Sequence, residues 1–158
     1  MVMETEWTLE RVLKLALKTE EESIQLYKSA IDKVTKHPGS KEFLMELVTE
    51  EEKHKEKILQ IIQDFSKLGE IGKLESTIHN LKIVDYLEDV TISPEADYQQ
   101  ILIYAGKREK NTHDFYMWFA KRYQGTKIGY LFKKLAQEEL KHKYRLEIEY
   151  DDTILKTM

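Results

Sequence analysis

Residues 50–54 read EEEKH, and residues 138–142 read EELKH. Each copy contains the pattern Glu-x-x-His, and the two pairs are Glu51 with His54 and Glu139 with His142. Residues three apart lie on one face of an α-helix, so each pair can direct a carboxylate and an imidazole at the same point. The repeated pattern therefore predicts two related helices with the same polar face.

A second pair of segments repeats elsewhere in the chain. LKTEEESIQLYKSA surrounds Glu20 and GKREKNTHDFYMWFA surrounds Glu109. In both segments a tyrosine follows the glutamate by seven residues, at Tyr27 and Tyr116. The order glutamate, Glu-x-x-His, glutamate, Glu-x-x-His indicates an internal repeat of two similar hairpins that face each other across a pseudo-twofold axis.

The hydrophobic pattern predicts four helices over residues 8–36, 40–67, 94–123 and 126–150. Short connections make the first two and the last two helices antiparallel hairpins. The long segment 68–93 predicts a crossover from one end of the bundle to the other. We therefore expect an all-α, ferritin-like four-helix bundle in one domain, 1–158. Its parts are hairpin 8–67, crossover 68–93, hairpin 94–150 and C-terminal tail 151–158.

The composition excludes several classes of protein. The 158 residues include no cysteine, which excludes disulfides and thiolate metal sites. With 25 basic and 29 acidic residues the net charge is −4, which argues against nucleic acid as a partner. No apolar stretch approaches the roughly 20 residues of a membrane span, and the N-terminus does not resemble a secretory signal. We expect a cytoplasmic protein that binds neither membrane nor nucleic acid.

The helical seams are apolar at both ends and polar in the middle. The polar positions are Glu20, Glu51, His54, Glu109, Glu139 and His142. Any one of them alone could be displaced to a solvated rim, but six at matching depth favour a buried cluster. An unpaired buried ion costs several kcal/mol, and no lysine or arginine occupies these layers. Two divalent metal ions would balance the four carboxylates, with neutral histidines as the remaining ligands.

These six residues, with Ser23, Tyr27, Thr112 and Tyr116 around them, resemble the ferritin-like di-iron carboxylate superfamily, and within it the rubrerythrin-type branch lacking the rubredoxin domain. The resemblance implies that Glu51 and Glu139 bridge two metals. Glu20 and Glu109 would then be terminal ligands, and His54 and His142 would each give a ring nitrogen. Iron is the expected metal, manganese is possible, and zinc can occupy such a site in isolated protein.

Two departures from the family pattern affect the expected chemistry. Rubrerythrins proper carry a rubredoxin-like domain with four cysteines, which this sequence does not contain. Electrons would then come from an external donor such as a separate rubredoxin. Many members also carry an extra glutamate one turn after the third-helix ligand, where this chain has Thr112. The adjacent His113 is either a substitute for that glutamate or, as we expect, a residue at the helix surface or behind the ligands.

The resemblance implies a di-iron oxidoreductase that reduces hydrogen peroxide or dioxygen, with a role in oxidative stress. Its metal-bound glutamates would be catalytic, and Tyr27 and Tyr116 would combine core packing with hydrogen bonds to them. Alternatives are a ferroxidase for iron storage, a metal-stabilised bundle without activity, and a manganese catalase or oxygenase. A homodimer or higher homo-oligomer is expected.

Overall fold

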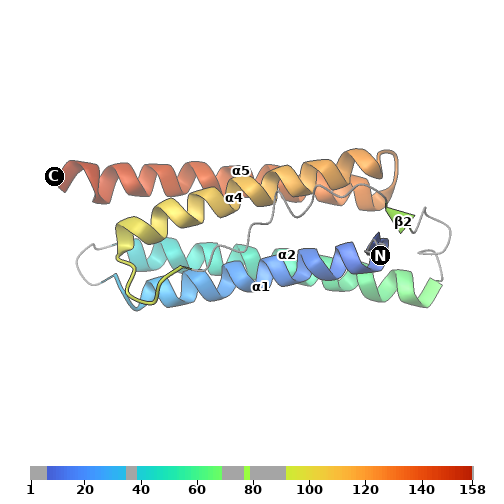
Figure 1. Ribbon diagram of the computed structural model, residues 1–158, viewed down its shortest axis with the longest axis horizontal. Helices are drawn as coiled ribbons and strands as arrows, with labels where there is room; N and C mark the ends of the chain where they lie inside the picture. The colour runs from blue at the N-terminus through green and yellow to red at the C-terminus, as the bar shows by residue number, and fades with distance from the viewer. Residues whose placement is uncertain (1–6, 35–38, 69–76, 79–91, 158) are drawn as a thin grey trace, which may run out of the picture.

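The computed structural model describes residues 7–34, 39–68, 77–78 and 92–157 (Figure 1). It contains four long helices: α1 (Leu9–Ile31), α2 (Ser40–Leu68), α4 (Tyr98–Arg122) and α5 (Lys127–Thr153). A 3-10 turn, η2 (Leu155–Thr157), follows α5. The predicted all-α four-helix bundle is confirmed: α1 packs along α2, α4 packs along α5, and the two hairpins lie against each other. None of the described helices has an apolar stretch long enough to cross a membrane.

The connection between the hairpins joins opposite ends of the bundle. Two short strands, β1 (Trp7–Thr8) and β2 (Thr77–Ile78), pair antiparallel beside the start of α1. At the far end of α1, the Lys33 ammonium donates to the carbonyls of Pro94 and Ala96, at 2.5 and 2.8 Å. Strand β2 therefore lies at one end of the bundle, and residues 94–96 lie at the other end. A long crossover between the hairpins requires this arrangement.

Local hydrogen bonds explain where the helices begin. The Thr8 hydroxyl accepts from the Arg11 amide at the start of α1. Asp97 and Gln100 form a reciprocal capping box at the start of α4, so this helix begins at Tyr98 rather than at the predicted residue 94. Ser40 is the first residue of α2, and its hydroxyl donates to Glu149 Oε1 on α5 at 2.6 Å.

Two helix ends differ from the predicted ones. α1 ends at Ile31 rather than at residue 36, because the Lys33 and Val34 amides bond to carbonyls three residues back and tighten the chain into a turn. α5 continues to Thr153, so the first part of the predicted tail is helical. His37 and His79 lie outside the described residues, as does most of the predicted crossover.

The core has two apolar parts with a polar layer between them. One part lies near the start of α1 and the α4–α5 turn and includes Leu13, Phe119 and Phe132. The other lies near the end of α1 and the start of α4 and includes Leu47 and Leu102. This division matches the predicted seams, which are apolar at both ends and polar in the middle. The apolar ends hold the four helices in register around the polar layer.

The α4–α5 turn brings two backbones into contact. Gly125 has a φ of 86°, a left-handed conformation that favours glycine. Gly129, in the first turn of α5, lies so close to α4 that an added Cβ would come within 2.1 Å of the Tyr123 carbonyl oxygen. The two glycines therefore let the second hairpin close tightly.

Candidate metal centre

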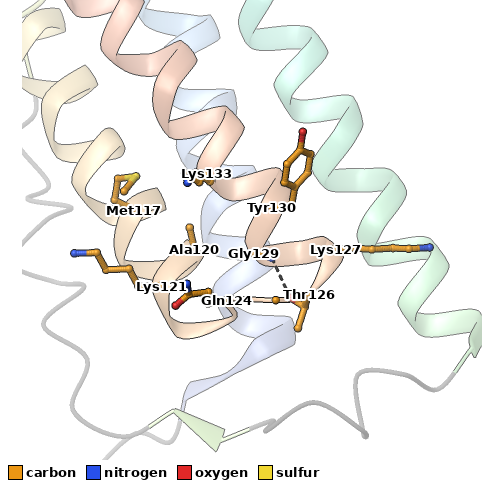
Figure 2. Close-up of a pocket in the computed structure, with 10 residues that line it drawn as sticks. Met117, Ala120, Lys121, Gln124, Thr126, Lys127, Gly129, Tyr130 and Lys133 are labelled. Carbon is orange, nitrogen blue, oxygen red and sulfur yellow. Dashed lines mark hydrogen bonds between the residues drawn. The ribbon is translucent and has the colours of Figure 1, made fainter.

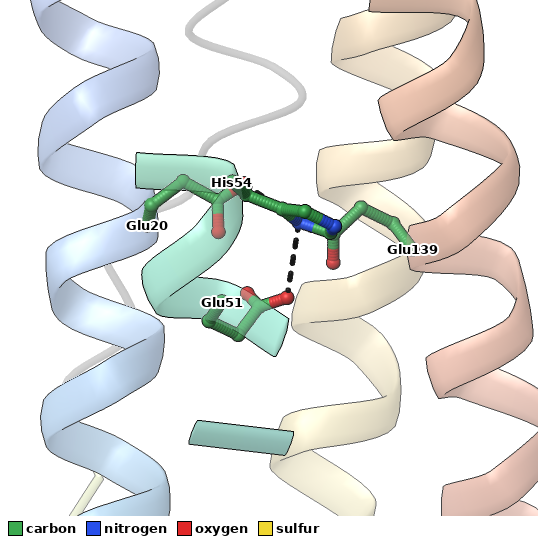
Figure 3. A group of neighbouring side chains, drawn as sticks. All are labelled: Glu20, Glu51, His54 and Glu139. Atoms are coloured by element: carbon green, nitrogen blue, oxygen red, sulfur yellow. Dashed lines mark hydrogen bonds and ion pairs between the residues drawn. The ribbon is translucent and has the colours of Figure 1, made fainter. Parts of the chain in front are cut away.

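The structure brings all six predicted polar residues into one buried cluster in the middle of the bundle. Their exposed fractions are between 0 and 3%. They are Glu20 on α1, Glu51 and His54 on α2, Glu109 on α4, and Glu139 and His142 on α5. Figure 3 shows Glu20, Glu51, His54 and Glu139 converging from three helices.

The cluster divides into two overlapping groups that could each hold a metal ion. One group is Glu20, Glu51, His54 and Glu139; the other is Glu51, Glu109, Glu139 and His142. Within each group one ligand atom of every residue lies within 4.8 Å of the others. Glu51 and Glu139 belong to both groups, which is the arrangement expected of two ions that share two bridging carboxylates.

Several buried atoms of the cluster lack a hydrogen-bond partner. They are Glu20 Oε2, Glu51 Oε1, Glu109 Oε2, Glu139 Oε2 and His142 Nδ1. His142 Nδ1 and Glu51 Oε1 are 3.0 Å apart, but the contact lacks hydrogen-bond geometry. In the described residues the one other such atom is Arg108 Nε. Buried polar atoms normally have a hydrogen-bond partner. These oxygen and nitrogen atoms are instead available as ligands for divalent cations.

Burial and mutual repulsion shift the pKa values of the carboxyl groups. Burial raises the pKa of Glu20 to about 8, and the negative charge of Glu51 contributes to the rise. Burial also raises the pKa of Glu139 well above its usual range, with the charges of Glu109 and Glu20 adding to it. Without metal, the site therefore favours protons on part of its carboxylates.

The two histidines supply positive charge in the metal-free arrangement. Burial acts to lower the pKa of His54, but hydrogen bonds to Glu138, Glu139 and other carboxylates outweigh it and the pKa is raised. The pKa of His142 is raised for the same reason. The rings stack with 5.7 Å between their centroids. Each imidazolium would have to release its Nδ1 proton before that nitrogen could bind a metal.

Each tyrosine bonds to the glutamate of the opposite hairpin. The Tyr27 hydroxyl on α1 donates to Glu109 Oε1 on α4, and the Tyr116 hydroxyl on α4 donates to Glu20 Oε1 on α1, the latter at 2.6 Å. Both rings are buried in the core. The sequence predicts the tyrosines near these carboxylates, but not that each one reaches across the bundle.

Arg108 bridges α1 and α4 beside the centre. The Arg108 guanidinium reaches across from α4 to donate to the Thr19 carbonyl, the Ser23 hydroxyl and Glu22. Thr112 and Ser23 are buried there. His113 lies outside both groups, with Nδ1 3.0 Å from the Asp114 carboxylate. Thr112, one turn after Glu109 on α4, therefore offers a hydroxyl and no carboxylate on this side.

The side between α2 and α5 opens into a cleft of about 290 Å³ that reaches both histidines. Glu50 and Glu138 line this cleft with four cationic side chains: Lys53, Lys57, Lys141 and Arg145. Sequence reasoning assigned no role to Glu50 or Glu138. The sequence does contain a sign of their importance, because a further glutamate precedes the Glu-x-x-His pair in both copies of the repeat.

A larger pocket of about 930 Å³ lies away from this centre, at the α4–α5 turn (Figure 2). Its lining includes Met117, Lys121, Lys127, Tyr130 and Lys133, with no histidine and no carboxylate. The pocket therefore lacks the carboxylate and imidazole ligands that the buried cluster provides.

Comparisons with known proteins find a family match and a solved structure of similar fold. A family model described as Rubrerythrin matches residues 11–99. The fold is similar to that of a hypothetical protein from Pyrococcus furiosus, with a TM-score of 0.68 and 22% identity over 91% of this chain and 89% of that one. A search of curated proteins finds no match.

Proposed function

The chain belongs to the rubrerythrin family, and from this we propose that its six buried residues hold two iron ions and that the loaded protein reduces hydrogen peroxide. The observation that carries the proposal is the pair of ligand groups that share Glu51 and Glu139. Ferritin-like di-iron proteins use the same set, one glutamate from each of two helices and Glu-x-x-His from each of the others.

In this proposal Glu51 and Glu139, which belong to both ligand groups, would help to hold both ions. Glu20 and His54 complete one position, and Glu109 and His142 complete the other. Four carboxylates and two imidazoles suit iron or manganese better than structural zinc, which takes four ligands and often prefers thiolates. Zinc can still occupy the positions in isolated protein.

Reduction of one hydrogen peroxide to two waters consumes two electrons and two protons. Two ferrous ions would supply the two electrons when bound, and an external donor such as a rubredoxin would restore them. The chain's own residues fix the carboxylates: the Tyr27 and Tyr116 hydroxyls hold Glu109 and Glu20 from the opposite hairpin. The cleft between α2 and α5, which both histidines line, is the proposed route for small reactants.

Metal analysis of protein purified without oxygen tests the centre. We expect two iron ions per chain, and a Glu51→Ala, Glu139→Ala double variant that binds none. The matched control is Glu52→Gln, because Glu52 is an exposed residue of α2 paired with Lys28 outside the cluster. Wild-type protein that binds no divalent metal would refute the proposal.

Stopped-flow oxidation of the ferrous protein tests the reaction. We expect one equivalent of peroxide to oxidise both irons much faster than dioxygen does. A preference for dioxygen would instead favour a ferroxidase. Sizing of the native protein separates the storage function, which requires a large cage, from the homodimer or small oligomer that we propose.

A further inference from the structure

The Nε2 atom of each histidine of the centre contacts a carboxylate on the opposite helix. His54 on α2 has Nε2 2.5 Å from Glu138 Oε2 on α5. His142 on α5 has Nε2 2.8 Å from Glu50 Oε2 on α2. The two contacts are reciprocal, so each Glu-x-x-His helix supplies the carboxylate that holds the other helix's imidazole.

The other ring nitrogen of each histidine faces the buried carboxylates. His54 Nδ1 is 2.8 Å from Glu139 Oε1 and 3.3 Å from Glu51 Oε1. His142 Nδ1 is 3.0 Å from Glu51 Oε1. Each ring thus lies between an outer carboxylate at Nε2 and the candidate metal position at Nδ1.

The outer carboxylates differ from the ligands in their surroundings. The Glu138 and Glu50 side chains are 31% and 41% exposed, whereas both histidine side chains are 3% exposed. Arg145 fixes Glu50 with a contact of 2.8 Å and binds Glu46 with its second nitrogen at 2.5 Å. Lys57, which follows His54 by three residues as Arg145 follows His142, lines the same cleft. The hydrogen bond with His54 lowers the pKa of Glu138, and the charge of Lys57 adds to this effect. Glu50 and Glu138 therefore lie at the wall of the cleft, outside both ligand groups.

We propose that Glu50 and Glu138 are positioning residues of the metal centre, which hold His142 and His54 as Nε2–H tautomers with Nδ1 free to bind metal. This inference rests on the proposed metal centre but not on peroxide reduction. A carboxylate that accepts the outer N–H of a metal-binding histidine fixes both its tautomer and its ring orientation, and it raises the basicity of the ligand nitrogen. Arg145 extends the arrangement by orienting Glu50.

Titration of the metal-stripped full chain with Co²⁺ tests the proposal, since Co²⁺ absorption reports the ligands. Glu138→Gln and Glu50→Gln should each weaken one of the two Co²⁺ positions by about 10- to 100-fold and leave the other close to wild type. Glu46→Gln is the matched control for Glu50, because Glu46 shares the contact with Arg145 but touches no histidine. Glu147→Gln, which breaks an exposed pair with Lys143, is the control for Glu138.

A second measurement separates positioning from general stability. In Zn²⁺-loaded protein, ¹⁵N signals of the imidazoles should show His54 and His142 as Nε2–H tautomers, and Glu138→Gln should shift the His54 signal alone. Equal Co²⁺ affinities in wild type and both variants would overturn the positioning roles and leave the metal centre standing. Wild-type protein that binds no Co²⁺ would overturn the metal centre and the positioning roles together.

Discussion

Glu139 lies among three other buried carboxylates and accepts from His54 at 2.8 Å. Burial and the charges of Glu109 and Glu20 raise its pKa, so the metal-free site favours its protonated form. Bound divalent cations would favour the ionised form of Glu139 instead, because their positive charge would balance the negative charge of the carboxylates. The same carboxyl group therefore serves two states of the protein, and substitutions should affect the two states differently.

Glu139→Gln should separate these states. The amide has nearly the shape of the protonated carboxyl, so the metal-free free energy of unfolding should change by less than about 1 kcal/mol. The rise in melting temperature on adding Mn²⁺ should fall to less than half, since the amide carries no charge. Thermal unfolding with and without Mn²⁺ measures both effects, with Glu147→Gln as the exposed control. A large loss of metal-free stability would contradict the expectation.

Tyr27→Phe and Tyr116→Phe remove one hydroxyl each and leave a buried carboxyl oxygen without its donor. We expect each variant to lose about 1–2 kcal/mol of unfolding free energy in urea titrations of the metal-free protein. Tyr144→Phe is the matched control, because Tyr144 is 55% exposed, and it should change little. Losses no larger than the control would show that these hydroxyls do not stabilise the fold.

At the residue scale, the sequence predicts which side chains meet but not all of their partners. The seam positions of Glu20 and Glu109 follow from helical periodicity, and the structure brings them together with the other four. That Tyr27 bonds to Glu109 rather than to a residue of its own hairpin depends on how the hairpins are offset. Periodicity within one helix contains no information about that offset.

At the scale of the elements, helix ends depend on a few local hydrogen bonds. The order of four helices and the short turns follow from apolar spacing and from glycine positions, and both are predictable. The start of α4 is set by the Asp97–Gln100 capping box, a signal present in the sequence beside the more conspicuous Pro94. The end of α1 follows from the Lys33 and Val34 amides, which bond to carbonyls three residues back, and apolar spacing does not reveal such a turn.

Two glycine substitutions test the packing of the second hairpin. Gly129→Ala would place a Cβ 2.1 Å from the Tyr123 carbonyl oxygen, so the backbones of α4 and α5 must separate. We expect a loss of at least about 2 kcal/mol of unfolding free energy. Gly106→Ala, within α4 and facing open space, is the matched control and should gain about 0.5–1 kcal/mol. Equal stabilities in urea titrations would show that the close contact is unimportant.

At the scale of the whole molecule, the buried cluster sets how stability depends on pH. In the metal-free protein the pKa of Glu20 rises from 4.5 to about 8, so folding takes up a proton between these values. This contribution to stability is fully present below about pH 4.5 and is lost as pH rises towards 8. The raised pKa values of His54 and His142 act in the same direction above about pH 6.5.

Metal binding should oppose this loss, because the cations replace the protons and their affinity increases as protons leave the ligands. The increase in melting temperature on adding Mn²⁺ should therefore be larger at pH 8 than at pH 6. Thermal unfolding of stripped and loaded protein at both pH values measures the difference. Metal-free stability that increases from pH 5 to pH 8 would contradict the assigned protonation of the cluster.

The contacts between the two hairpins also show that neither hairpin is complete without the other. Each hairpin contributes to the centre a single glutamate, one Glu-x-x-His pair, one tyrosine and one outer carboxylate. The tyrosine and the outer carboxylate contact residues of the opposite hairpin. Two identical copies of a single hairpin, related by a twofold axis, would supply the same set. A single hairpin would therefore complete such a centre only as a dimer. The two hairpins differ at equivalent positions, where Arg145 follows His142 by three residues and Lys57 follows His54 by three.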